Sequence, residues 1–253
     1  MDHVAVLVKD VPAGPELPGL HDDFTLMRSE QDSTMSGVDL FAVTAARDVG
    51  RHVTAVTMGP PAAVGTLREA LSLGADAAVH ICDRRLRGVS AVPTAHVLER
   101  ALRPLEVDAV FLGRESSDGR TGVVGGMLAE LLGWPLISGA DELEHHGGSF
   151  TARIRENDTA TYVRTPLPAV VTVAEYGADP NPLDAASLRR AFLTPVRTID
   201  LDSLGTNLPL STQQQISRVE ERHRPREKRL VTDHEEAISL LRQEIRRVKV
   251  GSA

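Results

Sequence analysis

The sequence is poor in cysteine and in aromatic residues, and each shortage limits the architecture. Cys82 is the single cysteine, so an intrachain disulfide is impossible and a zinc site built on several cysteines is excluded. The 253 residues include five Phe, two Tyr and one Trp, so the core has to be assembled from Val, Leu, Ala and Ile. Such a core suits parallel strands that are covered by helices.

Long apolar runs and an excess of positive charge are also absent. No run approaches 18 apolar residues, and no charged segment with a long apolar stretch precedes the first strand-like run, so neither a transmembrane helix nor a signal peptide is predicted. The formal net charge of −7 argues against general nucleic-acid binding. We therefore expect a cytoplasmic protein that is not an integral membrane protein and has no nucleic-acid partner.

Known catalytic motifs are missing as well. The sequence has no GxSxG elbow, no HExxH helix and no GK[ST] phosphate loop. His145 and His146 stand beside Gly147 and Gly148 in a predicted turn, where solvated side chains are expected rather than metal ligands. Cys82 follows a predicted strand and is interpreted as a buried, inert thiol. We predict no catalytic side chain and no metal site.

The segments that are present alternate between strand-like and helix-like patterns. Continuous apolar runs predict strands buried on both faces at 4–8, 53–58, 77–81, 109–112 and 169–173. Apolar positions at helical spacing predict helices at 39–49, from Pro60 to a stop at Gly74, at 94–102 and at 123–132. This rhythm indicates an α/β fold with right-handed βαβ units and a doubly wound, mostly parallel sheet of Rossmann-like type.

An antiparallel hairpin is predicted beside the parallel strands. Residues 150–155 and 159–164 have strand-like composition, with the turn residues Asn157-Asp158 between them. Mixed sheets with such an antiparallel edge are common. A second departure from the rhythm is residues 13–37, rich in Pro, Gly, Asp and Ser, which predict a long excursion.

After Val173 we expect the βα rhythm to be lost. We place an α/β nucleotide-binding domain at 1–200 and a C-terminal arm at 201–253. A capping box at Thr232–Glu235 and apolar residues at helical spacing after it predict that the arm ends in an amphipathic helix. From the residues alone, the arm wraps either its own domain or a partner.

The strongest local signal for function lies between Phe111 and Gly126. A buried strand runs into a glycine-bearing loop and then a helix, which brings backbone N–H groups and a positive helix end to the carboxyl edge of the sheet. Asp118 is suited to accept hydrogen bonds from a ribose. The glycine spacing matches neither the dinucleotide fingerprint nor a P-loop, so the segment predicts either a nucleotide loop or a tight turn with glycines for packing.

Two further features point to the same edge of the sheet. The loop Thr57–Pro60 joins a buried strand to a helix start, and it is either a second side of a ligand crevice or a simple turn. Lys9, the one lysine in the first 227 residues, follows the first strand and either attracts phosphate or is merely solvated.

Several ordered motifs resemble the beta subunit of electron transfer flavoproteins. They cover roughly residues 3–200 in the family's order, and together they are a specific signal. They are the opening Val6–Pro12, the segment Met35–Ala42, the loop Met58–Pro61, the helix Leu67–Asp76, the loop Gly113–Gly125, the helix Met127–Pro135 and the strand Leu167–Val173.

The resemblance implies a heterodimer. In this family the alpha subunit holds most of the FAD, the beta subunit binds AMP or a second FAD, and the beta subunit's C-terminal arm embraces the alpha subunit. Electrons pass from flavin dehydrogenases toward a quinone-linked acceptor, so a carrier subunit without catalytic groups of its own is expected. The candidate cofactor-binding residues, with Lys9 among them, are Leu7, Lys9, Ser36, Gly37, Val38, Asp39, Met58, Gly113, Arg114, Glu115, Ser116, Ser117, Asp118, Gly119, Arg120, Thr121, Gly122, Val123 and Val124.

The nucleotide motifs also depart from the family pattern. Ser36-Gly37 stands in place of Asn-Pro, Arg114-Glu115 in place of Lys-Gln, Arg120 in place of Asp, and Val123 in place of Gln. A lost carboxylate and a gained cation favour a ligand with more phosphate charge, whereas the lost amides remove polar contacts.

The resemblance also suggests how dehydrogenases dock. The family uses a leucine that follows Ser or Thr, and the matching step here is Ser187-Leu188. An alternative from another class is a regulatory module of adenine nucleotide α-hydrolase-like fold, which binds an adenine nucleotide and forms a homodimer without an alpha subunit.

Overall fold

The computed structural model describes residues 1–14, 19–22, 33–176, 184–205, 208–210, 218–219 and 230–250. The chain divides into two compact units, Met1–Ile216 and Ser217–Ala253, and each is described by itself. The other parts of the predicted excursion at 13–37 and of the predicted arm at 201–253 lie outside the described residues.

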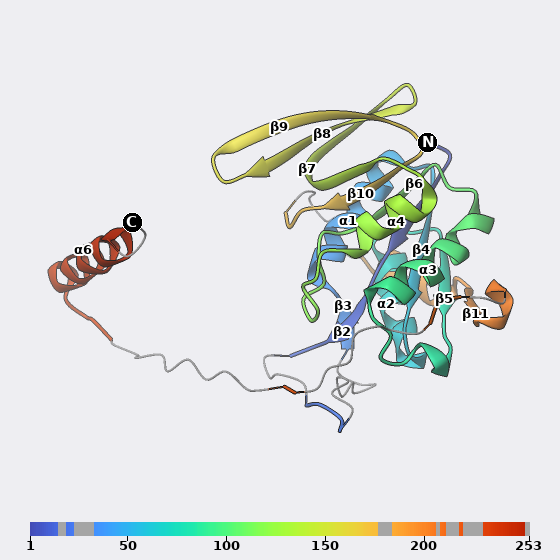
Figure 1. Cartoon of the computed structure of the whole chain (residues 1–253), viewed down its shortest axis with the longest axis horizontal. Coiled ribbons are helices and arrows are strands. Elements are labelled where there is room, and N and C mark those ends of the chain that lie inside the picture. Colours follow the sequence, from blue (N-terminus) through green and yellow to red (C-terminus); the bar gives the residue numbers. More distant parts are fainter. Residues whose placement is uncertain are drawn as a thin grey trace. The chain divides into compact units, whose positions relative to one another are not determined.

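The larger unit is built on one long sheet (Figure 1). Within the described residues it has nine strands in the order β11-β5-β4-β1-β6-β10-β7-β8-β9. Their bounds are β1 (His3–Leu7), β4 (His52–Met58), β5 (Ala77–Ile81), β6 (Ala109–Gly113), β7 (Leu136–His146), β8 (Ser149–Glu156), β9 (Thr159–Pro166), β10 (Ala169–Val173) and β11 (Val196–Ile199). From β11 to β7 neighbouring strands are parallel, and β8 and β9 extend the sheet as an antiparallel edge.

A small second sheet lies at the start of the chain. β2 (Asp10–Pro12) pairs antiparallel with β3 (Ser33–Met35), and these strands bracket part of the predicted excursion. The antiparallel hairpin predicted between 150 and 164 is confirmed as β8 and β9.

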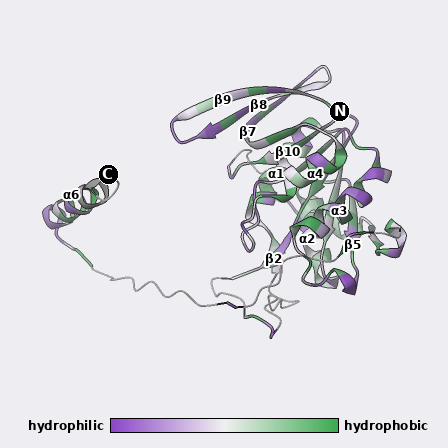
Figure 2. Cartoon of the chain, in the orientation of Figure 1, coloured by the Kyte–Doolittle hydropathy of each residue, from purple (hydrophilic) through white to green (hydrophobic). Residues whose placement is uncertain are grey.

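Helices cover both faces of the parallel strands. The helices of the larger unit are α1 (Gly37–Val49), α2 (Val64–Ser72), α3 (Ala91–Leu102), α4 (Val124–Leu132) and α5 (Ala185–Leu193), with 3₁₀ turns η1 (Pro61–Ala63), η2 (Arg84–Leu86), η3 (Arg103–Leu105) and η4 (Asp202–Leu204). Val6 of β1 packs in a core cluster with α1 and α2, whereas its neighbour Leu7 packs with α3 and α4. Both faces of the strand are therefore buried. Figure 2 shows hydrophobic residues concentrated on the parallel strands, and the predicted doubly wound, mostly parallel fold is confirmed.

β1 lies at the point where the winding of the sheet reverses. Its neighbours are β4 on one side and β6 on the other. The chain reaches β4 through α1 on one face, and it reaches β6 through α3 on the opposite face. In open α/β sheets the connections diverge at such a point and leave a crevice at the carboxyl ends of the strands.

The strand β7 is missing from the sequence-based prediction, which places His145 and His146 in a turn. The structure shows an eleven-residue strand whose first part pairs with β10 and whose last part pairs with β8. In that last part the exposed residues Glu142, Glu144 and His146 alternate with partly buried ones, so it lacks the apolar run typical of a buried strand. The turn consists of Gly147 and Gly148 alone, both with positive φ.

The expected loss of the βα rhythm after Val173 is also wrong. α5 and β11 follow, and β11 pairs parallel with β5 at the far edge of the sheet. Their hydrophobic pattern is weak because α5 buries a single residue, Ala191, and β11 has four residues of which none is fully buried. Short elements that bury so little apolar surface carry little periodicity.

The smaller unit contains α6 (His234–Val250). Asp233 caps this helix by accepting the backbone N–H of Glu236 at 2.8 Å, one position later than the predicted box at Thr232–Glu235. Ile238, Leu241 and Ile245 recur at helical spacing with exposed side chains, in agreement with the predicted amphipathic helix. Among the described residues, no helix combines the length and the apolar character required to cross a membrane.

Candidate nucleotide-binding site

The predicted nucleotide residues gather at the carboxyl ends of β1 and β6. Lys9 follows β1, the N-cap Ser36 precedes α1, and the loop after Gly113 connects β6 to α4. Met58 ends β4, the next strand along, and is partly buried. These segments are far apart in the sequence but meet at the reversal point of the sheet, where a ligand crevice is expected.

Asp39 ties the two central strands together. Its carboxylate accepts the backbone N–H of Lys9 at 2.8 Å and the backbone N–H of Gly113 at 3.0 Å. Asp39 lies in the first turn of α1, where the helix dipole favours negative charge. Burial raises its pKa to about 7, although the two N–H groups and the Lys9 ammonium oppose that shift. Asp39 is thus a buried tie beneath the site.

Lys9 is engaged with the loop and is not simply solvated. Its ammonium lies 2.6 Å from Oδ1 of Asp118 and 3.1 Å from Oγ of Ser116. The Asp118 carboxylate also accepts the N–H of Gly119 at 2.7 Å. Burial acts to raise the pKa of Asp118, but these hydrogen bonds and the Lys9 charge outweigh it and hold the pKa below its usual value. Lys9 therefore organises the loop.

Ser36 provides a third link to the same loop. It is fully buried, and its hydroxyl accepts the backbone N–H of Ser117 at 3.3 Å. It makes no side-chain cap to α1, although it occupies the N-cap position. Its backbone N–H donates to the carbonyl of Lys9 at 2.9 Å. The loop is thus held by Asp39, Lys9 and Ser36, each from a different point of the chain.

Glycine is required at the end of β6, beside the Asp39 carboxylate. A Cβ on Gly113 would come within 2.4 Å of Oδ1 of Asp39, so any side chain would displace the carboxylate. Farther along the loop, Arg120 and Gly122 both have left-handed backbone conformations, with φ of 45° and 63°. The loop therefore has a defined and partly strained shape.

The outer side of the loop offers groups suited to an anion. Most of its residues are exposed, including both cations: Arg114, Glu115, Ser117, Gly119, Arg120, Thr121, Gly122 and Val123. Val123 occupies the N-cap position of α4, and its side chain makes no capping hydrogen bond. The positive end of this helix therefore faces the loop with its first N–H groups uncapped by that side chain. These features fit a phosphate group, so the loop is a candidate nucleotide loop.

The remaining predicted contacts differ in exposure. Leu7 is a core residue with its side chain packed against α3 and α4, while Gly37 is exposed and Val38 and Val124 are partly buried. The second loop, at 57–60, is fastened to the first strand because the Thr57 hydroxyl donates to the carbonyl of Val8 at 2.7 Å.

One aromatic residue near this edge is absent from the predicted set. Tyr176 follows β10 with a left-handed φ of 63°, and its ring lies 5.3 Å from that of Phe41 in α1. The backbone N–H of Arg114 donates to the carbonyl of Val173, the last residue of β10, so this segment adjoins the loop. Nothing in the local sequence distinguishes Tyr176 from an ordinary loop residue.

The predicted docking leucine lies on α5. Asp184 and Ser187 form a capping box at the start of this helix, and Leu188 in its first turn is 43 % exposed. Phe192 and Leu193 are exposed as well, at 74 % and 71 %. A short helix that turns three large apolar side chains to the outside presents an apolar surface of the kind found at binding sites.

Groups suited to metal binding do not cluster in the described part of the chain. No three His, Cys, Asp or Glu side chains come together there as a metal site. Cys82 is partly buried, and burial with the nearby Asp83 charge raises the pKa of its thiol, which makes it a poorer nucleophile.

The loop between β6 and α4, here called the switch-point loop, and its supports belong to an α/β protein of the doubly wound class. Residues 23–204 match the electron transfer flavoprotein domain. The chain is 33 % identical over 220 residues to the electron transfer flavoprotein subunit beta of Mycobacterium leprae, covering 82 % of each chain. It is 31 % identical over 206 residues to the protein of that name from Clostridium acetobutylicum, covering 80 % of each chain.

A further relative carries a different name. The acryloyl-CoA reductase electron transfer subunit gamma of Anaerotignum propionicum is 27 % identical over 209 residues, which is 79 % of this chain and 78 % of that protein. From the domain match and the identities to beta subunits, the chain belongs to the electron transfer flavoprotein beta-subunit family. Membership in this family makes it an electron-carrier subunit associated with flavin rather than an enzyme.

Proposed function

We propose that this chain is the beta subunit of a heterodimeric electron transfer flavoprotein. It pairs with an alpha subunit, accepts electrons from flavin dehydrogenases and passes them toward a quinone-linked acceptor through FAD held at the subunit interface. The redox chemistry is that of the flavin. The work of this chain is to hold a nucleotide, shape the interface and dock the electron donor.

The observation that carries the proposal is the preorganised loop at the reversal point of the sheet. Asp39, Lys9 and Ser36 fix the loop from below, and the exposed side of the loop faces outward with Arg114 and Arg120. A site already ordered before binding loses less entropy when the ligand arrives. The bound molecule is AMP or a second FAD.

The charges of the loop determine where phosphate binds. Because the Lys9 ammonium is engaged with Asp118, the guanidinium groups of Arg114 and Arg120 are the exposed cations available to phosphate. Guanidinium groups bind phosphate oxygens in bidentate fashion. This favours a ligand with more than one phosphate charge at the loop.

Two other regions serve partners. The exposed residues Leu188, Phe192 and Leu193 of α5 dock the dehydrogenase, through brief contacts that suffice for electron transfer. The arm at 201–253 binds the alpha subunit, and the apolar residues of α6 supply contact surface within it. The relative from Anaerotignum propionicum, named as an electron transfer subunit of a reductase, is consistent with a redox enzyme as partner.

The test is to purify the chain together with its alpha subunit and to record the visible spectrum. Flavin absorption in the complex, with FAD released on denaturation, is the expected result. A complex without flavin would refute the electron-carrier role. A monodisperse, ATP-binding homodimer that does not pair with an alpha subunit would instead support the regulatory module.

A further inference from the structure

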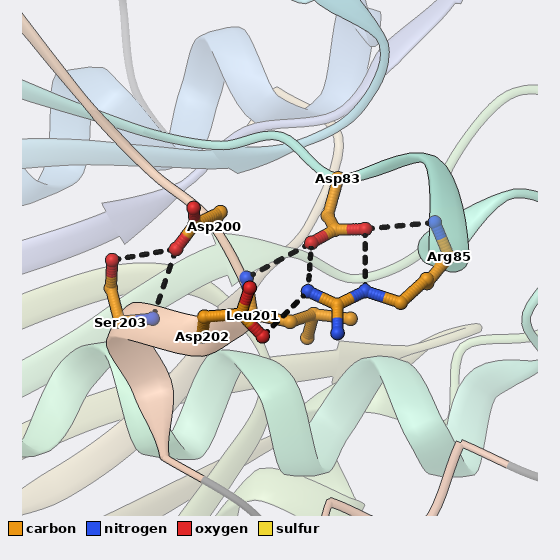
Figure 3. Close-up of polar contacts among 6 residues, drawn as sticks. All are labelled: Asp83, Arg85, Asp200, Leu201, Asp202 and Ser203. Carbon is orange, nitrogen blue, oxygen red and sulfur yellow. Dashed lines mark hydrogen bonds and ion pairs between the residues drawn. The ribbon is translucent and has the colours of Figure 1, made fainter.

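The chain leaves the sheet at a cluster of polar contacts, here called the exit clasp, which is formed by Asp83, Arg85, Asp200, Leu201, Asp202 and Ser203 (Figure 3). β5 and β11 are parallel neighbours, so the turns that follow them, η2 and η4, meet at one edge. The backbone N–H of Cys82 donates to the carbonyl of Ile199 at 2.9 Å and extends this pairing one residue beyond β5.

Asp83 is the centre of the clasp. Its carboxylate accepts the backbone N–H of Arg85 at 2.9 Å, the Arg85 Nε at 3.0 Å and Nη2 at 2.6 Å, and the backbone N–H of Leu201 at 3.3 Å. Its side chain is only 10 % exposed. These donors, those of Arg85 above all, hold the pKa of Asp83 well below its usual range, so the clasp stays charged at every physiological pH.

Arg85 extends the clasp to the segment after β11. Its Nη2 also lies 2.9 Å from Oδ1 of Asp202, so one guanidinium bridges η2 and η4. Asp200 closes η4 by accepting the backbone N–H of Ser203 at 2.9 Å and its hydroxyl at 2.6 Å. The backbone at 200–203 is therefore fixed at several points.

An apolar anchor lies directly beneath these bonds. The Leu201 side chain is buried in the core cluster with α3 and α4, and the partly buried Leu204, Leu208 and Leu210 pack on the same cluster. The core is therefore covered without help from Arg85, whose side chain is half exposed. Because exposed ion pairs contribute little to folding stability, the main effect of the clasp is to set the geometry of the chain after β11.

We propose that Arg85 is a positioning residue for subunit assembly, which fixes the first residues of the C-terminal arm in place for the alpha subunit. This inference rests on the proposed heterodimer. A segment ordered before association loses less conformational freedom on binding, so the clasp raises the affinity for the alpha subunit. Arg85 has this effect indirectly, through its contacts with Asp83 and Asp202.

The test compares Arg85→Gln with Arg84→Gln, which removes the same charge from the same 3₁₀ turn at an exposed position. The dissociation constant for the alpha subunit is measured with the full-length chain at fixed ionic strength. We expect it to rise about tenfold for Arg85→Gln and less than about twofold for Arg84→Gln. Arg85→Lys keeps the charge but not the bidentate fork, and should fall between them.

Two measurements separate positioning from folding. The melting temperature of the isolated chain should change by less than about 3 °C in Arg85→Gln, because the Asp83 carboxylate keeps the backbone N–H groups of Arg85 and Leu201 as donors. Asp202→Asn removes the bridge to η4 and leaves the Asp83–Arg85 pair, so it should weaken assembly by about threefold without altering the melting temperature.

Equal dissociation constants for the two Gln variants would overturn the positioning role of the clasp and leave the proposed heterodimer standing. A weaker complex that appears only together with a lower melting temperature, in both Arg85→Gln and Asp202→Asn, would also overturn it. Failure of the unaltered chain to bind the alpha subunit would overturn the proposed heterodimer and the inference together.

Discussion

The ammonium of Lys9 lies 2.6 Å from the Asp118 carboxylate, which joins the end of β1 to the loop between β6 and α4. The Asp118 side chain is 7 % exposed and that of Lys9 is 44 % exposed, so a partly exposed lysine holds a largely buried carboxylate of the loop. The pair crosses the reversal point of the sheet, where the ligand crevice is expected. A break in this pair should therefore affect both the loop and the ligand.

Lys9→Met should loosen the loop and weaken nucleotide binding. The substitution leaves the largely buried Asp118 without its cation, which should lower the free energy of unfolding by about 1–2 kcal/mol. Nucleotide retained by the purified heterodimer should fall in parallel. The double variant Lys9→Met with Asp118→Asn removes the stranded charge and should recover part of the stability. Unchanged stability and unchanged retention in Lys9→Met would contradict the role of the pair.

Asp39 should make stability depend on pH. Its pKa is about 7 in the folded chain and about 3.9 in an unfolded one. The folded state thus binds this proton more tightly, so the stabilising contribution is complete below about pH 4 and disappears as the pH rises to about 7. Asp39→Asn should remove this decline. The check is the free energy of unfolding by urea, measured for the unaltered chain and the variant at pH 5, 6, 7 and 8. Parallel curves for the two chains would show that Asp39 does not titrate in this range.

Gly113→Ala should destabilise the site from within. The added Cβ would lie within 2.4 Å of Oδ1 of Asp39 and displace the carboxylate from its two N–H donors. The free energy of unfolding should fall by about 1–3 kcal/mol, with loss of bound nucleotide. Gly65→Ala is the matched control, since that glycine lies exposed in α2 with open space at its Cβ position, and it should stabilise by about 0.5–1 kcal/mol. Equal effects of the two substitutions would refute the tie.

Leu188→Ala should reduce electron transfer from the dehydrogenase and leave the flavin spectrum intact. Truncation of an exposed apolar contact is expected to raise the KM for the dehydrogenase several-fold, as for an interface contact of about 1–2 kcal/mol. Val92→Ala is a suitable control because Val92 is similarly exposed, on α3 at the opposite face of the sheet. An equal KM in Leu188→Ala and Val92→Ala would place the docking surface elsewhere.

The parallel strands and the glycine-bearing loop after β6 were predictable because their signals are local. A run such as 109–112, buried on both faces, is apolar throughout, and the glycine-bearing loop after it is visible in the sequence itself. β7 and β11 were not predictable, because exposed and very short strands gain their pairing from partners distant in the sequence.

The hydrogen bonds within the candidate site were also not predictable from the sequence. Asp39 and Gly113 are 74 positions apart, and their hydrogen bond forms because α1 packs against β6, the neighbour of β1 in the sheet. The ion pair between Lys9 and Asp118 could not be predicted either, because the two residues lie 109 positions apart in the sequence. The sequence identifies the loops of the candidate site, whereas the contacts that shape these loops depend on strand order.

We propose that the switch-point loop of this chain holds a nucleotide within a flavin-containing heterodimer. Mass spectrometry of the ligands released from the purified heterodimer, compared with those from the Gly113→Ala complex, tests this proposal. We predict FAD together with AMP, or two FAD, from the unaltered complex, and one FAD alone from Gly113→Ala. A single FAD from both complexes, with no second nucleotide, would contradict the claim.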